Sequence, residues 1–112
     1  MTPADFRKIA LSMPEAIESE HMAHPDFRVG GKIFATLGYP DHDHGMVNLP
    51  PEEQARLVRA HPKLFFPAKG EWGRSGSTSV RLELIDRATL QSVMEIAWRR
   101  RAPKRLASGK MA

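Results

Sequence analysis

Two cations flank a glycine pair that could bring a peptide backbone close to a phosphate. Arg28 and Lys32 stand on either side of Gly30-Gly31, within a segment rich in β-forming residues. A two-residue turn between strands needs positive φ at both central positions, which glycine adopts without strain. The pattern predicts a narrow hairpin tip that carries two phosphate-binding side chains.

A second basic segment, 69–77, is predicted to be a long glycine-containing loop that leads into a strand. Lys69 and Arg74 flank Trp72 in this loop. An indole ring can stack on a base or sugar while the neighbouring cations contact phosphates. DNA is therefore the predicted partner, and the candidate nucleic-acid-binding residues are Arg28, Lys32, Lys69, Trp72 and Arg74.

The same residues also have a purely structural interpretation. Lysine and arginine at strand edges and hairpin tips discourage edge-to-edge aggregation, and Trp72 would then cover the core. A second functional class is a protein- or peptide-interaction module that uses an exposed sheet face or strand edge. Phe34, Phe65 and Phe66 are the candidates for such a face.

The positive charge is concentrated at the C-terminus. The chain has 17 basic and 13 acidic residues, and no acidic residue follows position 98. The body of the protein is thus slightly acidic, which is a poor electrostatic match for duplex DNA. A basic tail attracts polyanions without sequence preference, whereas cations at the end of a helix also complement its dipole. The tail cations are Arg99, Arg100, Arg101, Lys104, Arg105 and Lys110.

Other chemistries have little support. The segment 41–44 alternates Asp and His, with His21 and His24 elsewhere in the chain, but a metal site needs three or four convergent ligands and a solvated turn is the preferred interpretation. The chain has no cysteine. Its serines lack a nucleophile elbow, and its glycine-rich segment 70–76 lacks the ending of a phosphate loop. We predict a protein that is not an enzyme and binds no cofactor or metal.

Periodicity and turn residues predict the elements that position these side chains. Helices are expected over 2–13, 50–61 and 86–103, and strands over 16–22, 27–37 (a hairpin), 46–49, 64–67 and 78–84. This order predicts an α+β, two-layer fold, an antiparallel sheet with helices on one face in the order α-β(3-4)-α-β(2)-α.

Length and composition predict one domain, 1–103, followed by a basic, flexible tail, 104–112. The sequence shows no leader pattern and no apolar run of membrane-spanning length. We therefore expect a cytoplasmic monomer with no membrane partner.

Several short motifs occur in the order typical of one family. These are Phe27–Ala35, Asn48-Leu49 before an acidic helix start, Trp72-Gly73-Arg74 before a strand, and Ala97-Trp98 at the end of the last helix. In these motifs the whole chain resembles the MmcQ/YjbR-like proteins. The resemblance implies a two-layer α+β fold, and it implies DNA binding by paired hairpins of a "double wing" type.

Overall fold

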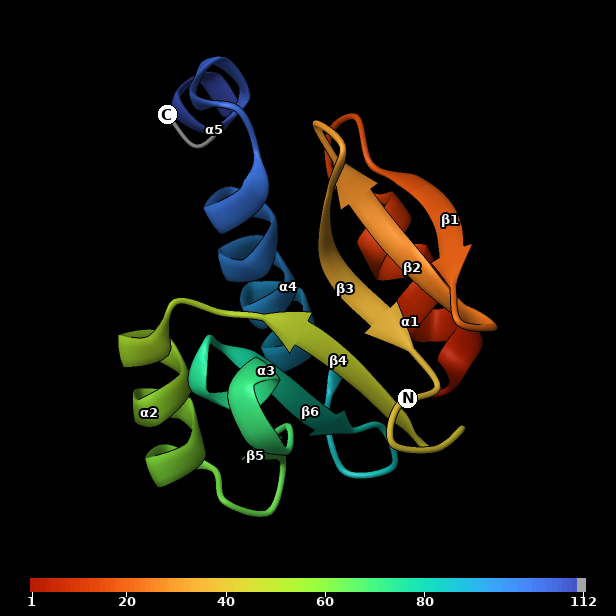
Figure 1. Cartoon of the computed structure of the whole chain (residues 1–112), viewed down its shortest axis with the longest axis vertical. Helices are drawn as coiled ribbons and strands as arrows, with labels where there is room; N and C mark the ends of the chain where they lie inside the picture. The colour runs from red at the N-terminus through yellow and green to blue at the C-terminus, as the bar shows by residue number, and fades with distance from the viewer. Residues whose placement is uncertain (111–112) are drawn as a thin grey trace.

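The computed structural model describes residues 1–110, which form a mixed α+β fold (Figure 1). The N-terminal half contains one helix and four strands. They are α1 (Pro3–Leu11), β1 (Ile17–His21), β2 (His24–Val29), β3 (Lys32–Leu37) and β4 (His44–Asn48). Thr2 and Asp5 form a capping box that begins α1, with Pro3 in the first turn.

The C-terminal half alternates helices with two short strands. Its elements are α2 (Pro51–Ala60), β5 (Phe65–Pro67), α3 (Gly70–Arg74), β6 (Ser77–Arg81), α4 (Arg87–Arg101) and α5 (Lys104–Lys110). Asp86 caps α4 by accepting a hydrogen bond from the backbone N–H of Thr89.

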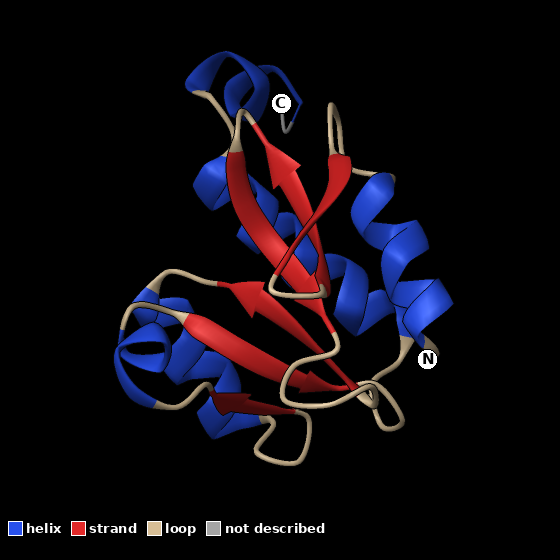
Figure 2. Cartoon of the chain, turned by 45° about the vertical axis from the view of Figure 1, so that its right-hand side comes forward, coloured by secondary structure: helices blue, strands red, loops and turns tan. Residues whose placement is uncertain are grey.

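The six strands form one antiparallel sheet in the order β1-β2-β3-β4-β6-β5. Figure 2 shows that it is strongly twisted, with β1, β2 and β3 turned away from β4, β6 and β5. The predicted fold class is confirmed. The structure also contains two short helices, α3 and α5, that were not predicted from the sequence.

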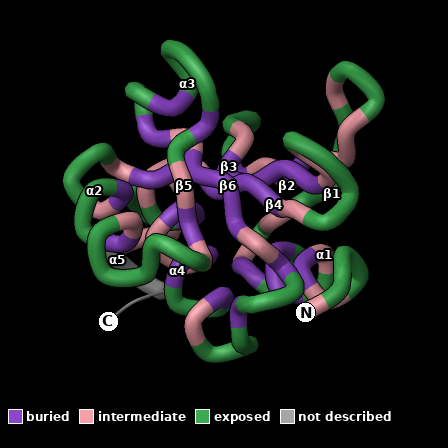
Figure 3. The backbone as a smooth tube through the Cα atoms, turned by 90° about the horizontal axis from the view of Figure 1, so that it is seen from below, coloured by how far each residue is buried: buried purple, intermediate pink, exposed green. Residues whose placement is uncertain are grey.

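One face of the sheet packs against α1 and α4, which lie behind the strands in Figure 1. The Phe6 ring on α1 lies 6.1 Å from that of Phe27 on β2. Trp98 on α4 is buried, and its indole N–H donates to the carbonyl of Pro14 at 3.0 Å. The burial of apolar side chains between these two layers is the main stabilising contribution. Figure 3 shows the buried residues gathered where the strands cross the middle of the molecule.

A β-bulge decides which aromatic side chains are buried. Phe27 pairs with Ala35 and Arg28 pairs with Ile33, so Phe34 is the extra residue on β3. We expected Phe34 on the exposed face by simple alternation, and this was wrong because the bulge changes the alternation. Phe34 and Phe65 are both fully buried.

Two other expectations are corrected. The segment 69–77 contains the helix α3 rather than an irregular loop, and the last strand ends at Arg81 rather than continuing to position 84. The segment predicted to be a basic, flexible tail contains α5 over Lys104–Lys110, and its flexibility stays a prediction. Arg105 on α5 lies 3.4 Å from the Glu15 carboxylate. Positions 111 and 112 of the predicted tail lie outside the described residues.

Candidate functional site

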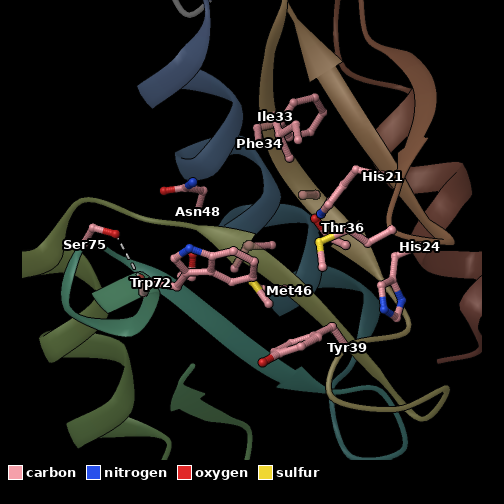
Figure 4. A pocket seen from close by; sticks show the side chains of 14 residues that line it. His21, His24, Ile33, Phe34, Thr36, Tyr39, Met46, Asn48, Trp72 and Ser75 are labelled. Carbon is pink, nitrogen blue, oxygen red and sulfur yellow. Dashed lines mark hydrogen bonds between the residues drawn. The ribbon is translucent and has the colours of Figure 1, made fainter. Parts of the chain in front are cut away.

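The sheet face opposite α1 and α4 contains a cavity of about 410 Å³. We call this cavity the hollow. Its volume lies within the usual range of small-ligand sites. Among the residues that line it are His21, His24, Tyr39, Met46, Asn48 and Trp72. Figure 4 shows their side chains standing in front of the sheet.

An aromatic wall closes the lower side of the hollow in Figure 4. Trp72 comes from α3 and is 50% exposed. Its ring lies 6.3 Å from that of Tyr39, which in turn makes an edge contact with His24 at 6.1 Å. Aromatic pairs at such distances attract one another. The wall therefore offers a half-exposed indole face beside a phenol ring.

Gln54 on α2 anchors the helix that carries Trp72. Its side-chain Nε2 donates to the carbonyls of Gly73 at 2.9 Å and Ser77 at 3.1 Å, and it lies 3.1 Å from the Thr78 hydroxyl. Gly73 permits this packing because a Cβ there would lie 1.8 Å from the Ala68 carbonyl oxygen. The indole is thus held by buried contacts although it is itself half-exposed.

A buried carboxylate lies beside the hollow. Asp26 on β2 has no solvent exposure, and its oxygens accept hydrogen bonds from Arg28 Nε at 2.7 Å and His21 Nδ1 at 2.7 Å. A second bond comes from Arg28 Nη2 at 3.0 Å. The Arg28 hydrogen bonds, and then that of His21, hold the pKa of Asp26 below its usual value although burial alone would raise it. His21 is thereby fixed in orientation.

A partly buried arginine lies behind the opposite wall. Arg100 on α4 donates from Nη1 to Asn48 Oδ1 at 2.8 Å, to the Ser75 carbonyl at 3.0 Å, and to the Leu49 carbonyl. Burial lowers the pKa of Arg100, and neighbouring Arg101 lowers it further. Sequence analysis assigned Arg100 to the basic C-terminal segment, but this guanidinium supports the wall of the hollow.

The five predicted nucleic-acid-binding residues are only partly brought together. Trp72 lines the hollow, and Arg28 lies on the same sheet face with its guanidinium bound to Asp26. Lys32 pairs with buried Val29, so the register directs it to the helix-covered side.

The other two predicted cations lie at the ends of α3. Lys69 is the residue before its first turn, and Arg74 ends it with a 2.6 Å ion pair to Glu71. Both are exposed. The Gly30-Gly31 tip does form the predicted turn, with φ of 58° and 79°. However, a Cβ at Gly30 would lie 3.1 Å from Pro103, so the tip approaches the chain between α4 and α5.

The Asp–His segment 41–44 forms a turn held by its own side chains. Asp41 Oδ1 lies 2.8 Å from His44 Nδ1 and accepts from the Asp43 N–H at 2.9 Å. The hydrogen bond with His44 is the main reason that the pKa of Asp41 is lowered. Within residues 1–110, no three His, Asp or Glu side chains converge as metal ligands would.

Sequence reasoning did not single out Tyr39, Asn48, Asp26 or Arg100 as site residues. Tyr39 follows β3 in a loop without a motif, and Asn48 entered only as part of a family motif with no role assigned to it. The helix α4 brings Arg100 to Asn48 across a separation of 52 residues. The alternation in β1 and β2 offered one usable signal. It places Asp26, Arg28 and His21 on one sheet face, where a carboxylate between two basic groups is favourable.

The comparison with family models decides the family. The YjbR model matches residues 11–100. The chain belongs to the YjbR family. Among solved structures, the Deinococcus radiodurans protein DR2400, whose domain is described as DUF419, is similar with a TM-score of 0.76. At 17% identity, the match covers 96% of this chain and 86% of that one, and it shows the shared fold. The chain matches no curated protein.

The expectation of YjbR-family membership is confirmed. Among the helices in the described part of this YjbR-family protein, none has both the length and the apolar character needed to cross a bilayer. The double-wing arrangement stays a prediction.

Proposed function

We propose that this protein binds single-stranded nucleic acid through the open face of its sheet, with a base stacked on Trp72 at the hollow. The observation that carries the proposal is the half-exposed indole beside Tyr39. Proteins that bind single strands combine such aromatic platforms with nearby cations. Lys69 and Arg74 at the two ends of α3 supply those cations.

An unpaired strand is favoured over a duplex for a geometric reason. A ring can enter the hollow only if its face and edge are free, and these are stacked and paired within a duplex. The Gly30-Gly31 tip, which a winged duplex binder would insert, approaches Pro103. The proposal is one of binding without a chemical step.

Tryptophan fluorescence tests the proposal directly. Trp98 is 1% exposed, so quenching by an added oligonucleotide reports chiefly on Trp72. We expect a single-stranded DNA of about 12 nucleotides to quench the emission saturably. Higher salt should weaken the binding because phosphate contacts release counterions. The matching duplex should bind more weakly.

Two variants sharpen this test. Trp72→Ala should lose about tenfold or more in affinity, because stacking on one aromatic ring contributes about 1–3 kcal/mol. Anisotropy of a labelled oligonucleotide provides the readout when the indole is absent. Lys32→Ala, which removes one cation on the other side of the sheet, is the matched control and should bind almost normally. No saturable binding by the wild type at low salt would refute the proposal.

A peptide is the second candidate ligand, and one observation favours it. In the described part of the chain, β1 pairs only with β2, so its outer edge is available for an added strand. Ile17 and Met22 are largely exposed along this strand and its turn. A peptide ligand would protect the outward amides of β1 from hydrogen exchange, which a ligand stacked on Trp72 would not do.

A further inference from the structure

Two charged groups, one buried and one partly buried, orient the polar side chains on either side of the hollow. Asp26 acts on His21, and Arg100 acts on Asn48. Figure 4 shows Asn48 at the left, above Trp72, and His21 at the right. Each charged group forms a hydrogen bond with one polar atom of the His21 or Asn48 side chain. The other polar atom of that side chain is therefore left for a ligand.

On the Asn48 side, the remaining atom is a donor. A guanidinium can only donate hydrogen bonds, so the Asn48 atom that meets it at 2.8 Å is the oxygen Oδ1. The other amide atom, Nδ2, makes no hydrogen bond within the described residues. It is also not among their buried unsatisfied atoms, so it reaches solvent where Asn48 lines the hollow. Asn48 therefore presents N–H groups to a ligand.

On the His21 side, the remaining atom is an acceptor. The ionised carboxylate of Asp26 can only accept hydrogen bonds, so His21 Nδ1 carries the proton in their 2.7 Å contact. With Nδ1 as the donor to Asp26, Nε2 is the ring atom left for a ligand, and it accepts a hydrogen bond in the neutral form of the ring. The other groups that face this ring are Arg28, which is itself bound to Asp26, and the cross-strand neighbour His24.

The spacing between the two sides suits one ring. His21 reaches over to Asp26 on β2, which is in register with Thr36 on β3 and Met46 on β4. Asn48 lies two residues beyond Met46, so its backbone is about 12 Å from that of Asp26. One heterocyclic ring with a hydrogen bond at each end covers about 10 Å of this separation, and the side chains of His21 and Asn48 line the space between. Trp72 and Tyr39 provide the aromatic wall for the flat faces of such a ring.

We propose that the hollow is a nucleobase-binding site that selects its ligand by a donor at Asn48 and an acceptor at His21. The ligand is a planar heterocycle with an acceptor at one end of an edge and an N–H donor at the other, as in cytosine with its O2 oxygen and N4 amino group. This inference rests on the proposed function, in which the base is part of a nucleic acid. The binding site itself can be tested with a free nucleoside.

Nuclear magnetic resonance on ¹⁵N-labelled protein tests the site with cytidine as the probe. We expect saturable shifts of the Asn48 side-chain amide and of the His21 ring nitrogens. The Gln54 side-chain amide is the internal control, because its Nε2 is already bound inside the protein. If cytidine leaves the Asn48 and His21 signals unmoved, the inference is wrong.

The variant Asn48→Asp converts the donor to an acceptor while keeping a partner for Arg100. We expect its affinity for cytidine to fall about tenfold. An oligonucleotide with abasic sites should bind the variant and the wild type alike. Equal losses for cytosine-containing and abasic strands would overturn the inference, because they would indicate charge repulsion.

His21→Phe tests the other side of the hollow while keeping a ring of similar shape. Arg28 still pairs with Asp26 in this variant, so the fold should be retained. Cytidine affinity should again fall about tenfold, and an unchanged affinity would contradict the assigned acceptor. Failure of the proposed function has a different signature, in which cytidine binds but no oligonucleotide binds.

Discussion

The two faces of the sheet are held by different interactions. The face toward α1 and α4 is covered by aromatic and aliphatic side chains, such as Phe6 against Phe27. The open face instead presents Asp26 with its two basic partners and a hollow beside Trp72. Apolar packing is non-directional, whereas buried charges need partners in fixed positions. The covered face therefore determines stability, and the open face determines which ligand fits.

The largest effect is expected on the covered face. Phe27→Ala should lower the free energy of unfolding by about 3–5 kcal/mol, because it leaves a void that its neighbours cannot fill. Met46→Ala on the open face should lower it by only about 2 kcal/mol, since the space that it leaves is continuous with the hollow. Urea unfolding of both variants measures the difference. Equal losses would contradict the comparison between the faces.

A smaller effect, with a pH signature, is expected from the buried carboxylate. Asp26→Asn should lower the free energy of unfolding by about 2 kcal/mol at neutral pH, because it weakens charge-assisted hydrogen bonds to Arg28 and His21. The folded state lowers the pKa of Asp26, so the unfolded chain binds more protons in acid. This stabilisation is present above the unfolded pKa of about 3.9 and is lost as the pH falls through the folded value.

Unfolding measured at neutral pH and near pH 3 checks that sign. The wild type should lose more stability in acid than Asp26→Asn does. Asp43→Asn is the matched control, because Asp43 lies exposed in the 41–44 turn, and it should change neutral stability by less than about 0.5 kcal/mol. A variant of Asp26 that keeps the wild-type acid dependence would show that another group is responsible.

The smallest stability effect is expected at the aromatic wall. Trp72→Ala should lower the free energy of unfolding by about 1 kcal/mol, which is the contribution of its contact with Tyr39. The same substitution has the large effect on oligonucleotide affinity described above. Thermal unfolding monitored by circular dichroism measures this change in stability. A loss comparable to that of Phe27→Ala would mean that Trp72 is a core residue.

The fold was predictable because its signals are local. The capping residues before α1 and α4, the Gly30-Gly31 turn and the apolar stripe of α4 each act over a few residues. The bulge at Phe34 was not predictable by alternation, since it depends on the pairing of β3 with β2. The helix α3 was also missed, because a five-residue helix leaves no periodic pattern.

The candidate site was only partly predictable for a related reason. Trp72 stood out as a tryptophan between two cations, and the structure places it at the hollow. The contact of Arg100 with Asn48 joins residues from α4 and β4, and no local pattern encodes such a contact. Lys32 was grouped with Arg28 on spacing, but Lys32 pairs with Val29, the neighbour of Arg28, so the register sends the two side chains to opposite faces.

Chemical-shift mapping of the backbone amides with a single-stranded oligonucleotide tests the central claim most directly. The claim is that the open sheet face, rather than the hairpin tip, is the binding surface. We predict that the largest shifts fall at His21, Tyr39, Asn48 and Trp72, with little change at Gly31 and Lys32. Shifts concentrated at Gly31, Lys32 and α5, with Trp72 unaffected, would contradict the account.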